Sequence, residues 1–562
     1  MTTLSSIRRI IGLAEGVGTK TYTTAAELPT TGLTAGDQAF VTSTGRLYIS
    51  NSSGWYNIAL INQAPYWIEQ PDGSYSLSTT GLSTVITILA GDSDGSTPIY
   101  TATADSDFNL IATITTDSEG ADGTTFVITP IDSEGGTAVA GSGIVTFVAT
   151  DGVNQASVAS TFSIAFAPDW TGTATESFIN SSTPLSGENY AISSSISGDG
   201  NYIGVGRRGY TDRGVSNSGA VDILAWNGSS YALQQVVVSN TAVETQYIGA
   251  SFDINYDGSY LAVACDKHTS NRLYVFTRSG STWTQQTQIA PPNSTNTGSD
   301  FGTKQTKIDK NANYIIVGDE SISTYGAVHV FKRTGSSWSL DATISPPANV
   351  ANQKFGSHIS INEDSTYLAI GERGYNSWQG RVHIYTRSGS SWTLQQSVVP
   401  ADTSSTYQLG YCSINNAGDT LLQCGYTGTQ SKAYIWSRSG STWSLQATLT
   451  PADGTGSPTR NFGTSGILNG TGDIVAIGAD KDDGNVGAVY IFDRSGSTWT
   501  QRKKVVPTIN KGTVYNINLP TSGYYDKAID MTESGDKVIA STHQNDYPNA
   551  NGNYGASWVW SV

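Results

Sequence analysis

The chain has 562 residues, of which 61 are glycine, 17 are proline, 14% are charged and only 2 are methionine. Strand-favouring residues are abundant and good helix formers are scarce, which excludes a helical bundle and predicts an all-β protein. The formal net charge of −16 argues against a nucleic-acid partner, which would require a basic surface, and against attachment to an anionic membrane.

The N-terminal segment has two arginines followed by an apolar run that is too short for a signal peptide. Residues 1–19 are expected to be a tail, in which Ser5–Ala14 forms either a short amphipathic helix that docks on a neighbour or a frayed terminus. Residues 20–62 alternate between apolar and polar positions. Two turn signals, Ser43–Gly45 and Asn51–Gly54, predict hairpins in a small β module.

Residues 63–167 are predicted to form a β-sandwich with seven short strands, a pattern typical of Ig-like or cadherin-like domains. The expected strands are 75–79, 84–90, 98–103, 110–115, 125–130, 143–150 and 156–166. The stretch Ala90–Gly95 resembles a cadherin calcium segment, in which Asp92 and Asp94 would be ligands. A plain β-turn is the alternative, and we expect no bound metal.

Residues 20–62 also resemble a small β module of virion structural proteins from tailed phages, especially phages of marine cyanobacteria. In those proteins an Ig-like domain commonly follows, as it does here. The resemblance implies that residues 1–62 bind other virion proteins. It also explains why an extracellular-looking chain begins without a signal peptide, since phage particles leave the host by lysis.

A repeat occupies the remainder of the chain. The phrase Arg-Ser/Thr-Gly-Ser-Ser/Thr-Trp occurs five times, ending at Trp283, Trp338, Trp392, Trp443 and Trp499. Upstream of each tryptophan, a first strand begins with an aromatic-Gly or similar pair. A polar turn, an apolar second strand and a third strand of alternating residues follow it. Four short strands in about 55 residues are typical of a β-propeller blade.

The second and third strands of this pattern each occur seven times, so we predict a seven-bladed propeller over residues 168–562. The last unit ends at Val562 without a fourth strand, whereas Trp170–Ile179 is an unassigned strand with the same opening. We expect Trp170–Ile179 to complete the last blade, because a closed ring leaves fewer exposed sheet edges.

The repeat resembles the FG-GAP family of integrin-α-like propellers over residues 176–562, through openings such as Phe301-Gly302 and strands that end in Val-Gly. Many members of that family have a calcium loop with several aspartates between the first two strands. The corresponding turns here, such as Ser197–Asn201 and Asn255–Ser259, have too few oxygen ligands, so ordinary hairpin turns are expected.

The Arg-Ser-Gly-Ser-Thr-Trp phrase also resembles the sialidase Asp-box, but an arginine replaces its defining aspartate in every copy. We expect the repeated tryptophan to pack between blades. No convergent carboxylate pair, nucleophile motif or metal-ligand spacing is evident, so no catalytic residue and no cofactor are predicted. Cys265, Cys412 and Cys424 are expected to be small buried residues.

The loops between second and third strands vary in length and should project from one face. Their aromatic residues are candidate ligand contacts for a glycan or protein, or alternatively pack the loops against the rim. These residues are Tyr210, Tyr325, Tyr375, Trp378, Tyr426, Tyr547 and Tyr554. One such loop, Asp480–Asn485, could hold a cation or be a solvated acidic loop.

The sequence therefore predicts a non-enzymatic phage virion protein, either a tail fibre or a surface decoration, located in the virion. Its N-terminus would anchor it, and its propeller would bind the host surface or a virion protein. Two alternatives remain open, a glycan-degrading propeller enzyme of the virion and a bacterial surface adhesin. A homo-oligomer is possible, because fibres are often trimers.

Overall fold

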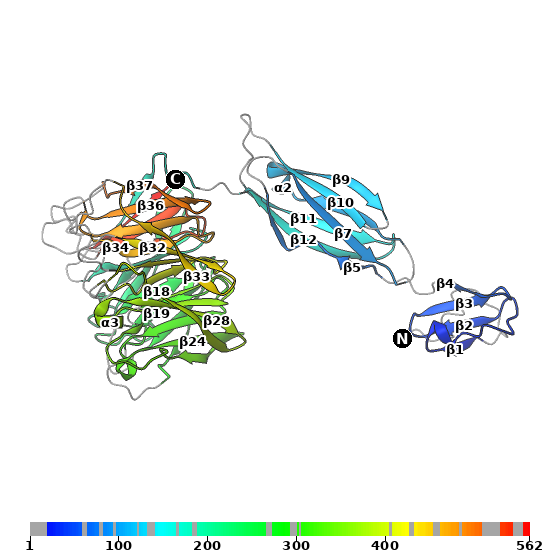
Figure 1. Ribbon diagram of the computed structural model, residues 1–562, viewed down its shortest axis with the longest axis horizontal. Helices are drawn as coiled ribbons and strands as arrows, with labels where there is room; N and C mark the ends of the chain where they lie inside the picture. Colours follow the sequence, from blue (N-terminus) through cyan, green and yellow to red (C-terminus); the bar gives the residue numbers. More distant parts are fainter. Residues whose placement is uncertain are drawn as a thin grey trace. The chain divides into compact units, whose positions relative to one another are not determined.

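The structure is a computed structural model that describes most of the chain. Described are residues 19–562 except 59–63, 78–82, 94–96, 121–122, 132–140, 165–167, 182–187, 266–271, 293–299, 303–304, 404–406, 426–431, 453–460, 483–485, 509–528 and 543–554. The expected helix at Ser5–Ala14 therefore lies outside the described residues. The chain divides into two compact units, Met1–Phe166 and Ala167–Val562. The fold is nearly all β, as predicted, and every sheet has four strands (Figure 1).

The first sheet of the N-terminal unit has the order β1-β2-β3-β4. Its elements are β1 (Lys20–Tyr22), η1 (Ala25–Glu27), β2 (Gln38–Val41), β3 (Arg46–Ser50) and β4 (Trp55–Ile58). Both predicted hairpins are confirmed, since β3 pairs antiparallel with β2 and with β4. The Asn51 side chain accepts hydrogen bonds from the backbone N–H groups of Ser53 and Gly54, both at 3.0 Å, which fixes the second turn.

The rest of this unit is a sandwich of two sheets, with orders β5-β7-β10-β9 and β6-β12-β11-β8. Its elements are β5 (Tyr66–Glu69), β6 (Ser74–Ser76), β7 (Thr84–Gly91), β8 (Ile99–Ala104), α2 (Phe108–Ile111), β9 (Ala112–Gly120), β10 (Gly123–Pro130), β11 (Gly141–Thr150) and β12 (Gln155–Ile164). The first strand is split, with β5 antiparallel to β7 and β6 parallel to β12, and the remaining order is that of an Ig-like sandwich. The predicted count of seven strands is wrong, because β5 was not foreseen.

The second unit contains seven four-stranded antiparallel sheets, the blades of the predicted propeller (Figure 1). In each of the first six blades the four strands are consecutive in the sequence. Their bounds are β14 (Tyr190–Ile196), β15 (Tyr202–Arg207), β16 (Ala220–Trp226), β17 (Tyr231–Val237); β18 (Ile248–Ile254), β19 (Tyr260–Cys265), β20 (Leu273–Ser279), β21 (Thr282–Ile289); β22 (Thr306–Ile308), β23 (Tyr314–Asp319), β24 (Ala327–Thr334), β25 (Ser337–Ile344); β26 (Phe355–Ile361), β27 (Tyr367–Glu372), β28 (Arg381–Ser388), β29 (Ser391–Val398); β30 (Tyr411–Ile414), β31 (Thr420–Cys424), β32 (Ala433–Ser439), β33 (Thr442–Leu449); β34 (Phe462–Leu468), β35 (Ile474–Ala479), β36 (Ala488–Ser495) and β37 (Thr498–Val505). Short helices η2 (Ile322–Thr324) and α3 (Tyr375–Trp378) lie in two of the loops.

The seventh blade has the order β13-β40-β39-β38, so its outer strand comes from before the first blade. Its strands are β13 (Thr175–Ile179), β38 (Ile529–Met531), β39 (Lys537–Thr542) and β40 (Ala556–Ser561). The predicted closing strand is thus confirmed: β13 pairs antiparallel with β40, and Trp170 donates from Nε1 to the carbonyl of Gly535 at 2.9 Å. Each inner strand contacts the inner strands of both neighbouring blades, including β14 with β38, which brings the two ends of the ring together.

The repeated tryptophan joins neighbouring blades, as predicted. Four of these indoles donate a hydrogen bond from Nε1 to a glutamine on the outer strand of the preceding blade. The pairs are Trp283–Gln234 (3.2 Å), Trp338–Gln286 (3.0 Å), Trp443–Gln395 (2.8 Å) and Trp499–Gln446 (2.9 Å). The repeat therefore encodes contacts between neighbouring blades.

The arginine of the repeat explains why the Asp-box aspartate is absent. Arg387 donates from Nε to the carbonyl of Ser365 in the first turn of its own blade, and its guanidinium lies 4.6 Å from the ring centre of Tyr314 in the preceding blade. Arg278, Arg333 and Arg438 make the same two contacts in their blades. An aspartate could make neither contact, since an ionised carboxylate has no hydrogen to donate and carries a negative charge.

The tryptophan–glutamine hydrogen bond between blades is missing at Trp392. Asp341 stands where the other blades have glutamine, and among the described residues the buried Nε1 of Trp392 has no hydrogen-bond partner. Asp341→Gln should raise the free energy of unfolding of the propeller by about 1 kcal/mol, because it supplies the missing acceptor. Denaturant unfolding followed by tryptophan fluorescence measures this. The reverse change at an intact link, Gln395→Asp, should destabilise by a similar amount, and equal stability of all three proteins would contradict the assignment.

Candidate functional site

The loops between second and third strands emerge from one face of the propeller, where the predicted aromatic residues lie. Tyr210, Tyr325 and Tyr375 are half-buried and Trp378 is 38% exposed. Tyr426, Tyr547 and Tyr554 lie outside the described residues. The structure thus places four of the seven candidates on this face, on blades 1, 3 and 4.

The described aromatics are occupied by contacts within the protein. The Arg207 guanidinium lies 4.4 Å from the ring centre of Tyr210, and the Arg381 guanidinium lies 3.9 Å from that of Tyr375. The loops are also bonded to the next blade, since the carbonyl of Tyr325 accepts the N–H of Phe355 and that of Trp378 accepts the N–H of Gln408. These contacts agree with the alternative that the aromatic residues pack the loops against the rim of the propeller. Ligand binding by these residues stays a prediction.

Two of the three acidic residues in the loop after β35 are buried, Asp480 and Asp482, whereas Lys481 between them is exposed. Asp480 is 0% exposed, and among the described residues neither of its carboxylate oxygens has a hydrogen-bond partner. Burial raises the pKa of Asp480 to about 7. Asp482 accepts a hydrogen bond from Tyr490 and pairs with Lys504 at 2.9 Å. The alternative of a solvated loop is therefore wrong for these two residues, and residues 483–485 lie outside the described part.

The opposite face of the propeller carries the turns between first and second strands. The prediction that these are ordinary hairpin turns is supported by their bonding, in which the first side chain of a turn closes it. Asn362, for example, accepts the N–H of Tyr367 at 2.7 Å through Oδ1 and donates from Nδ2 to the carbonyl of Asn416 in the next blade at 3.0 Å. Such bonds hold neighbouring turns in fixed positions around the ring.

The second residue of each turn points toward the axis of the ring. These seven residues are Gly198, Tyr256, Lys310, Glu363, Asn416, Gly470 and Glu533, and all of them line two cavities at the mouth of the central channel. The first and fourth positions of the turns are restricted to a few small or turn-forming residues, whereas the second position carries five different residue types. Variation at one position on a constant frame is what a recognition surface requires.

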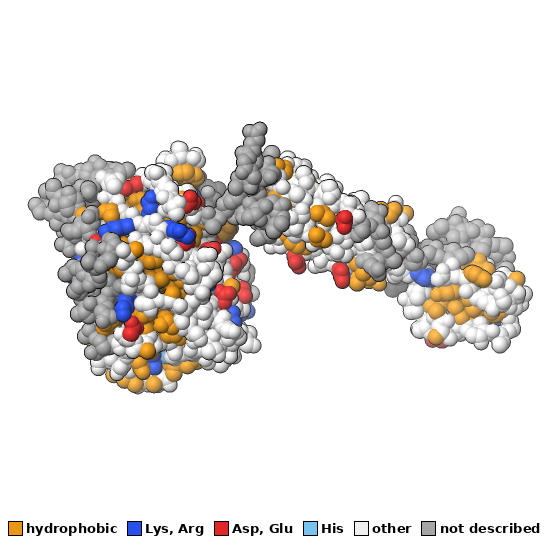
Figure 2. All heavy atoms as spheres, turned by 45° about the horizontal axis from the view of Figure 1, so that its top comes forward, with side chains coloured by type: hydrophobic (Ala, Val, Ile, Leu, Met, Phe, Trp, Pro, Cys, Tyr) orange, Lys and Arg blue, Asp and Glu red, His pale blue; other side chains and the backbone are white. Residues whose placement is uncertain are grey.

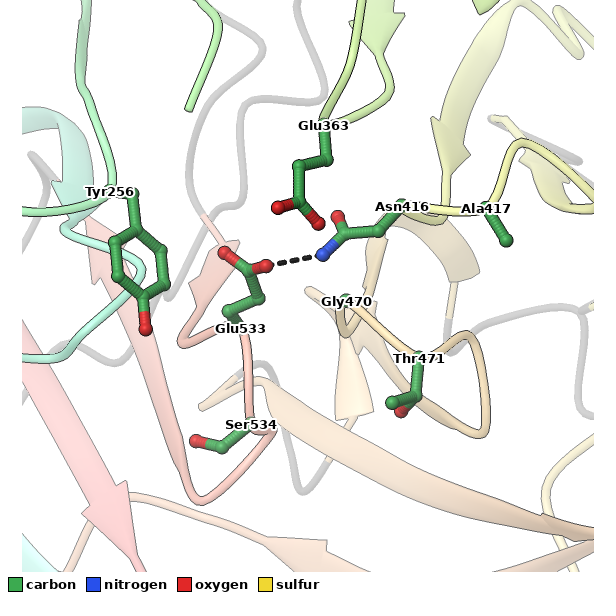
Figure 3. A pocket seen from close by; sticks show the side chains of 8 residues that line it. All are labelled: Tyr256, Glu363, Asn416, Ala417, Gly470, Thr471, Glu533 and Ser534. Carbon is green, nitrogen blue, oxygen red and sulfur yellow. Dashed lines mark hydrogen bonds between the residues drawn. The ribbon is translucent and has the colours of Figure 1, made fainter. Parts of the chain in front are cut away.

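The outer cavity has a volume of about 540 Å³ and is drawn in Figure 3. The carboxylates of Glu363 and Glu533 and the amide of Asn416 point toward one another, and Asn416 donates a hydrogen bond to Glu533. Lys310, from the turn of blade 3, places Nζ 2.6 Å from Glu363 and 3.2 Å from Glu533. The same Nζ lies 4.4 Å from the ring centre of Tyr256, within cation–π distance.

A smaller cavity of about 160 Å³ lies next to this mouth and is lined by residues of the inner strands. Asp253, Lys307 and Asp530 contribute to its wall, with Lys307 Nζ 3.7 Å from Asp253. The hydroxyl of Ser195 lies 3.2 Å from Asp253 and 3.0 Å from Asp530. Two lysines thus face five carboxylates across the two cavities, since Asp309 also lines the smaller one, which gives the lining a formal charge of −3.

Two glycines give Glu533 its position. A Cβ atom on Gly470 would lie 2.4 Å from Cγ of Glu533, and one on Gly198 would lie 2.3 Å from the Tyr256 ring. Any larger residue at either position would therefore displace a side chain of the cavity wall. These two glycines let the side chains of Tyr256 and Glu533 pack directly against the backbone, whereas other glycines of the turns provide a positive φ.

Comparisons with known proteins find an FG-GAP repeat in the propeller and leave the ligand open. The model of the FG-GAP repeat matches residues 443–492, which is one blade-length of the chain. The C-terminal WD40 domain of Sif2 is similar at 11% identity over 71% of this chain and 99% of that one, with a TM-score of 0.42. The WD40 repeats of RRP9 are 11% identical over 69% and 97%, with a TM-score of 0.43. The periplasmic gluconolactonase of Pseudomonas aeruginosa is 13% identical over 65% and 92%, with a TM-score of 0.41.

No curated protein matches the chain significantly. The structural likenesses concern the propeller fold alone, since identity is so low. Among the described residues, no helix is long and apolar enough to cross a membrane. Nor do three or more His, Cys, Asp or Glu side chains of the described part converge as they would around a metal ion.

The channel-mouth residues were not among the sequence-predicted candidates, and the four candidates that the structure describes lie on the other face. A signal for them is present in the sequence. When the seven first turns are placed in register, the second position alone collects a tyrosine, a lysine and two glutamates. In the view of Figure 2 most of the propeller surface is uncharged or hydrophobic, and several Asp and Glu side chains gather at one edge of it beside a few Lys or Arg side chains.

Proposed function

We propose that this protein is a non-enzymatic structural component of a tailed-phage particle, either a tail fibre or a surface decoration. Its residues 1–62 attach it to other virion proteins, and its propeller binds a host-surface glycan or protein, or an adjacent virion protein. The order of modules supports the virion role: a small four-stranded sheet precedes a sandwich with Ig-like strand order and a closed ring.

The arrangement of side chains at the channel mouth is the main support for the proposed binding function. An aromatic face, two carboxylates and an amide converge from different blades on a cavity of about 540 Å³, and the ammonium of Lys310, which lines the adjoining smaller cavity, pairs with both carboxylates. Cavities of this size with a few converging polar groups are typical binding sites. The rigid bonding of the turns lets the residues differ from blade to blade without changing the frame.

The same geometry favours binding over glycan hydrolysis. Hydrolysis by a carboxylate pair requires one carboxyl that carries a proton for the leaving group. Here a single ammonium, that of Lys310, donates to both Glu363 and Glu533, so both groups act as acceptors. The two carboxylates raise the pKa of Lys310 against the opposing effect of its burial, which keeps this ammonium charged.

Gold-labelled antibodies against the full chain, viewed on purified particles by electron microscopy, test the virion role. We expect label on the particle, at the tail, a fibre or the capsid. A chain that is abundant in infected cells but absent from purified particles would refute the proposal. Release of sugar fragments from host polysaccharide by the purified chain would instead support the enzyme alternative.

A further inference from the structure

The channel mouth holds an ammonium group in a nearly complete cage. The ammonium of Lys310 has a carboxylate on two sides, from Glu363 and Glu533, and the ring of Tyr256 on a third. These are the groups that recognise ammonium ligands: acceptors for its N–H donors and an aromatic face for its charge. The cage is built from blades 2, 4 and 7, while its occupant comes from blade 3.

The occupant reaches the cage on a flexible four-carbon stem, and its side chain is 26% exposed. The backbone of Glu533 is held on both sides of its turn, since its carbonyl accepts the N–H of Gly470 and its own N–H donates to the carbonyl of Gly198. Rotation about the stem of Lys310 would take its ammonium out of the cage without moving the backbone of these turns.

The charges around the mouth favour a further cation. One ammonium compensates only one of the two carboxylates in the cage, and the adjoining cavity repeats this imbalance with Lys307, Asp253 and Asp530. Beyond the cage the outer cavity continues past Asn416, Thr471 and Ser534, whose amide and hydroxyl groups can bond the polar groups of a larger ligand.

We propose that the channel mouth binds a ligand through its primary ammonium group, which takes the place of the Lys310 ammonium between Glu363, Glu533 and Tyr256. Lys310 acts as an internal competitor that the ligand displaces. This inference rests on the proposed binding function and adds the chemistry of recognition. The amide and hydroxyl groups of Asn416, Thr471 and Ser534 beyond the cage suit the hydroxyls of a sugar, so the ammonium is that of an amino sugar in a glycan.

Calorimetric titration of the full chain with three probes tests this inference. The probes are a glucosamine tetramer with free amines, its fully N-acetylated counterpart and Nα-acetyl-lysine methylamide. Removal of the competitor by Lys310→Ala should lower the dissociation constant for the amine probes at least ten-fold, because a tethered group has a high effective concentration. If Lys310→Ala folds poorly, Lys310→Gln takes its place, because it retains most of the stem. It should also lower the dissociation constant for the amine probes.

Two further variants supply the controls. Glu533→Gln, placed in the Lys310→Ala protein, should weaken amine binding at least ten-fold. Lys432→Ala removes an equal charge from a pair with Asp402 at a distant loop and should leave binding unchanged. Tighter binding of the glucosamine tetramer supports the assignment to a glycan, and tighter binding of the lysine probe would overturn it in favour of a protein.

Equal binding of the amine and N-acetylated tetramers would overturn the inference, as would a Lys310→Ala protein that binds amines no more tightly than the natural chain. Neither result would affect the labelling of particles, which tests the proposed function separately. Conversely, amine binding by a chain that is absent from particles would keep the inference and refute the virion role.

Discussion

Replacing Trp170 by alanine should lower the free energy of unfolding of the propeller by about 3–5 kcal/mol. The indole is 2% exposed, packs in the core of the last blade and donates a hydrogen bond to Gly535, 365 residues away in the sequence. It precedes the closing strand β13, which begins at Thr175, so the loss also weakens the pairing of β13 with β40. Equilibrium unfolding in denaturant measures the effect.

The exposed Trp378 provides the matched control. Its indole is 38% exposed, so Trp378→Ala should change stability by less than about 0.5 kcal/mol. If Trp170→Ala were as mild as this control, the closing strand would contribute little, and the ring would have to be held mainly by contacts between inner strands.

Replacing Asp480 by asparagine should stabilise the protein at neutral and higher pH. The pKa of Asp480 is about 7 in the folded protein, against an ordinary value of 3.8. Between these two pH values the unfolded chain loses the proton while the folded one keeps it, so stability falls as pH rises from about 4 to 7. A shift of this size corresponds to about 2–4 kcal/mol at pH 8, which Asp480→Asn should recover.

Unfolding free energies of both proteins from pH 4 to pH 8 check this prediction. The difference should fall below about 1 kcal/mol at pH 4, where the folded protein keeps the proton of Asp480 and the unfolded chain is only about half ionised. The neighbouring variant Asp482→Asn should act in the opposite direction, because it leaves Lys504 without its carboxylate. A pH-independent difference between Asp480→Asn and the natural protein would contradict the burial assigned to this carboxylate.

The propeller could be predicted from the sequence because its signals are local and repeated. The five tryptophans mark outer strands at nearly constant spacing, and the missing seventh outer strand has an obvious substitute in Trp170–Ile179. The sandwich was predicted less completely, since β5 (Tyr66–Glu69) is only four residues long and pairs through an irregular register. A strand this short has no clear alternation.

The channel mouth was not predictable by the same means. Its members lie on seven different turns, and Lys310 reaches Glu533 across 223 residues of sequence. Only closure of the ring brings them together. Asp480 shows a second limit, because its acidic, glycine-containing loop resembles a solvated turn, whereas packing between blades removes its carboxylate from water.

Adsorption of the full chain to host cells tests most directly whether the propeller binds through its channel mouth. Two variants should be compared with the natural protein, one at the mouth (Tyr256→Ala with Glu533→Gln) and one on the opposite face (Tyr325→Ala with Trp378→Ala). We predict that the mouth variant loses at least ten-fold in apparent affinity while the loop variant is unchanged. Loss of adsorption by the loop variant alone would contradict the account and return the site to the aromatic loops.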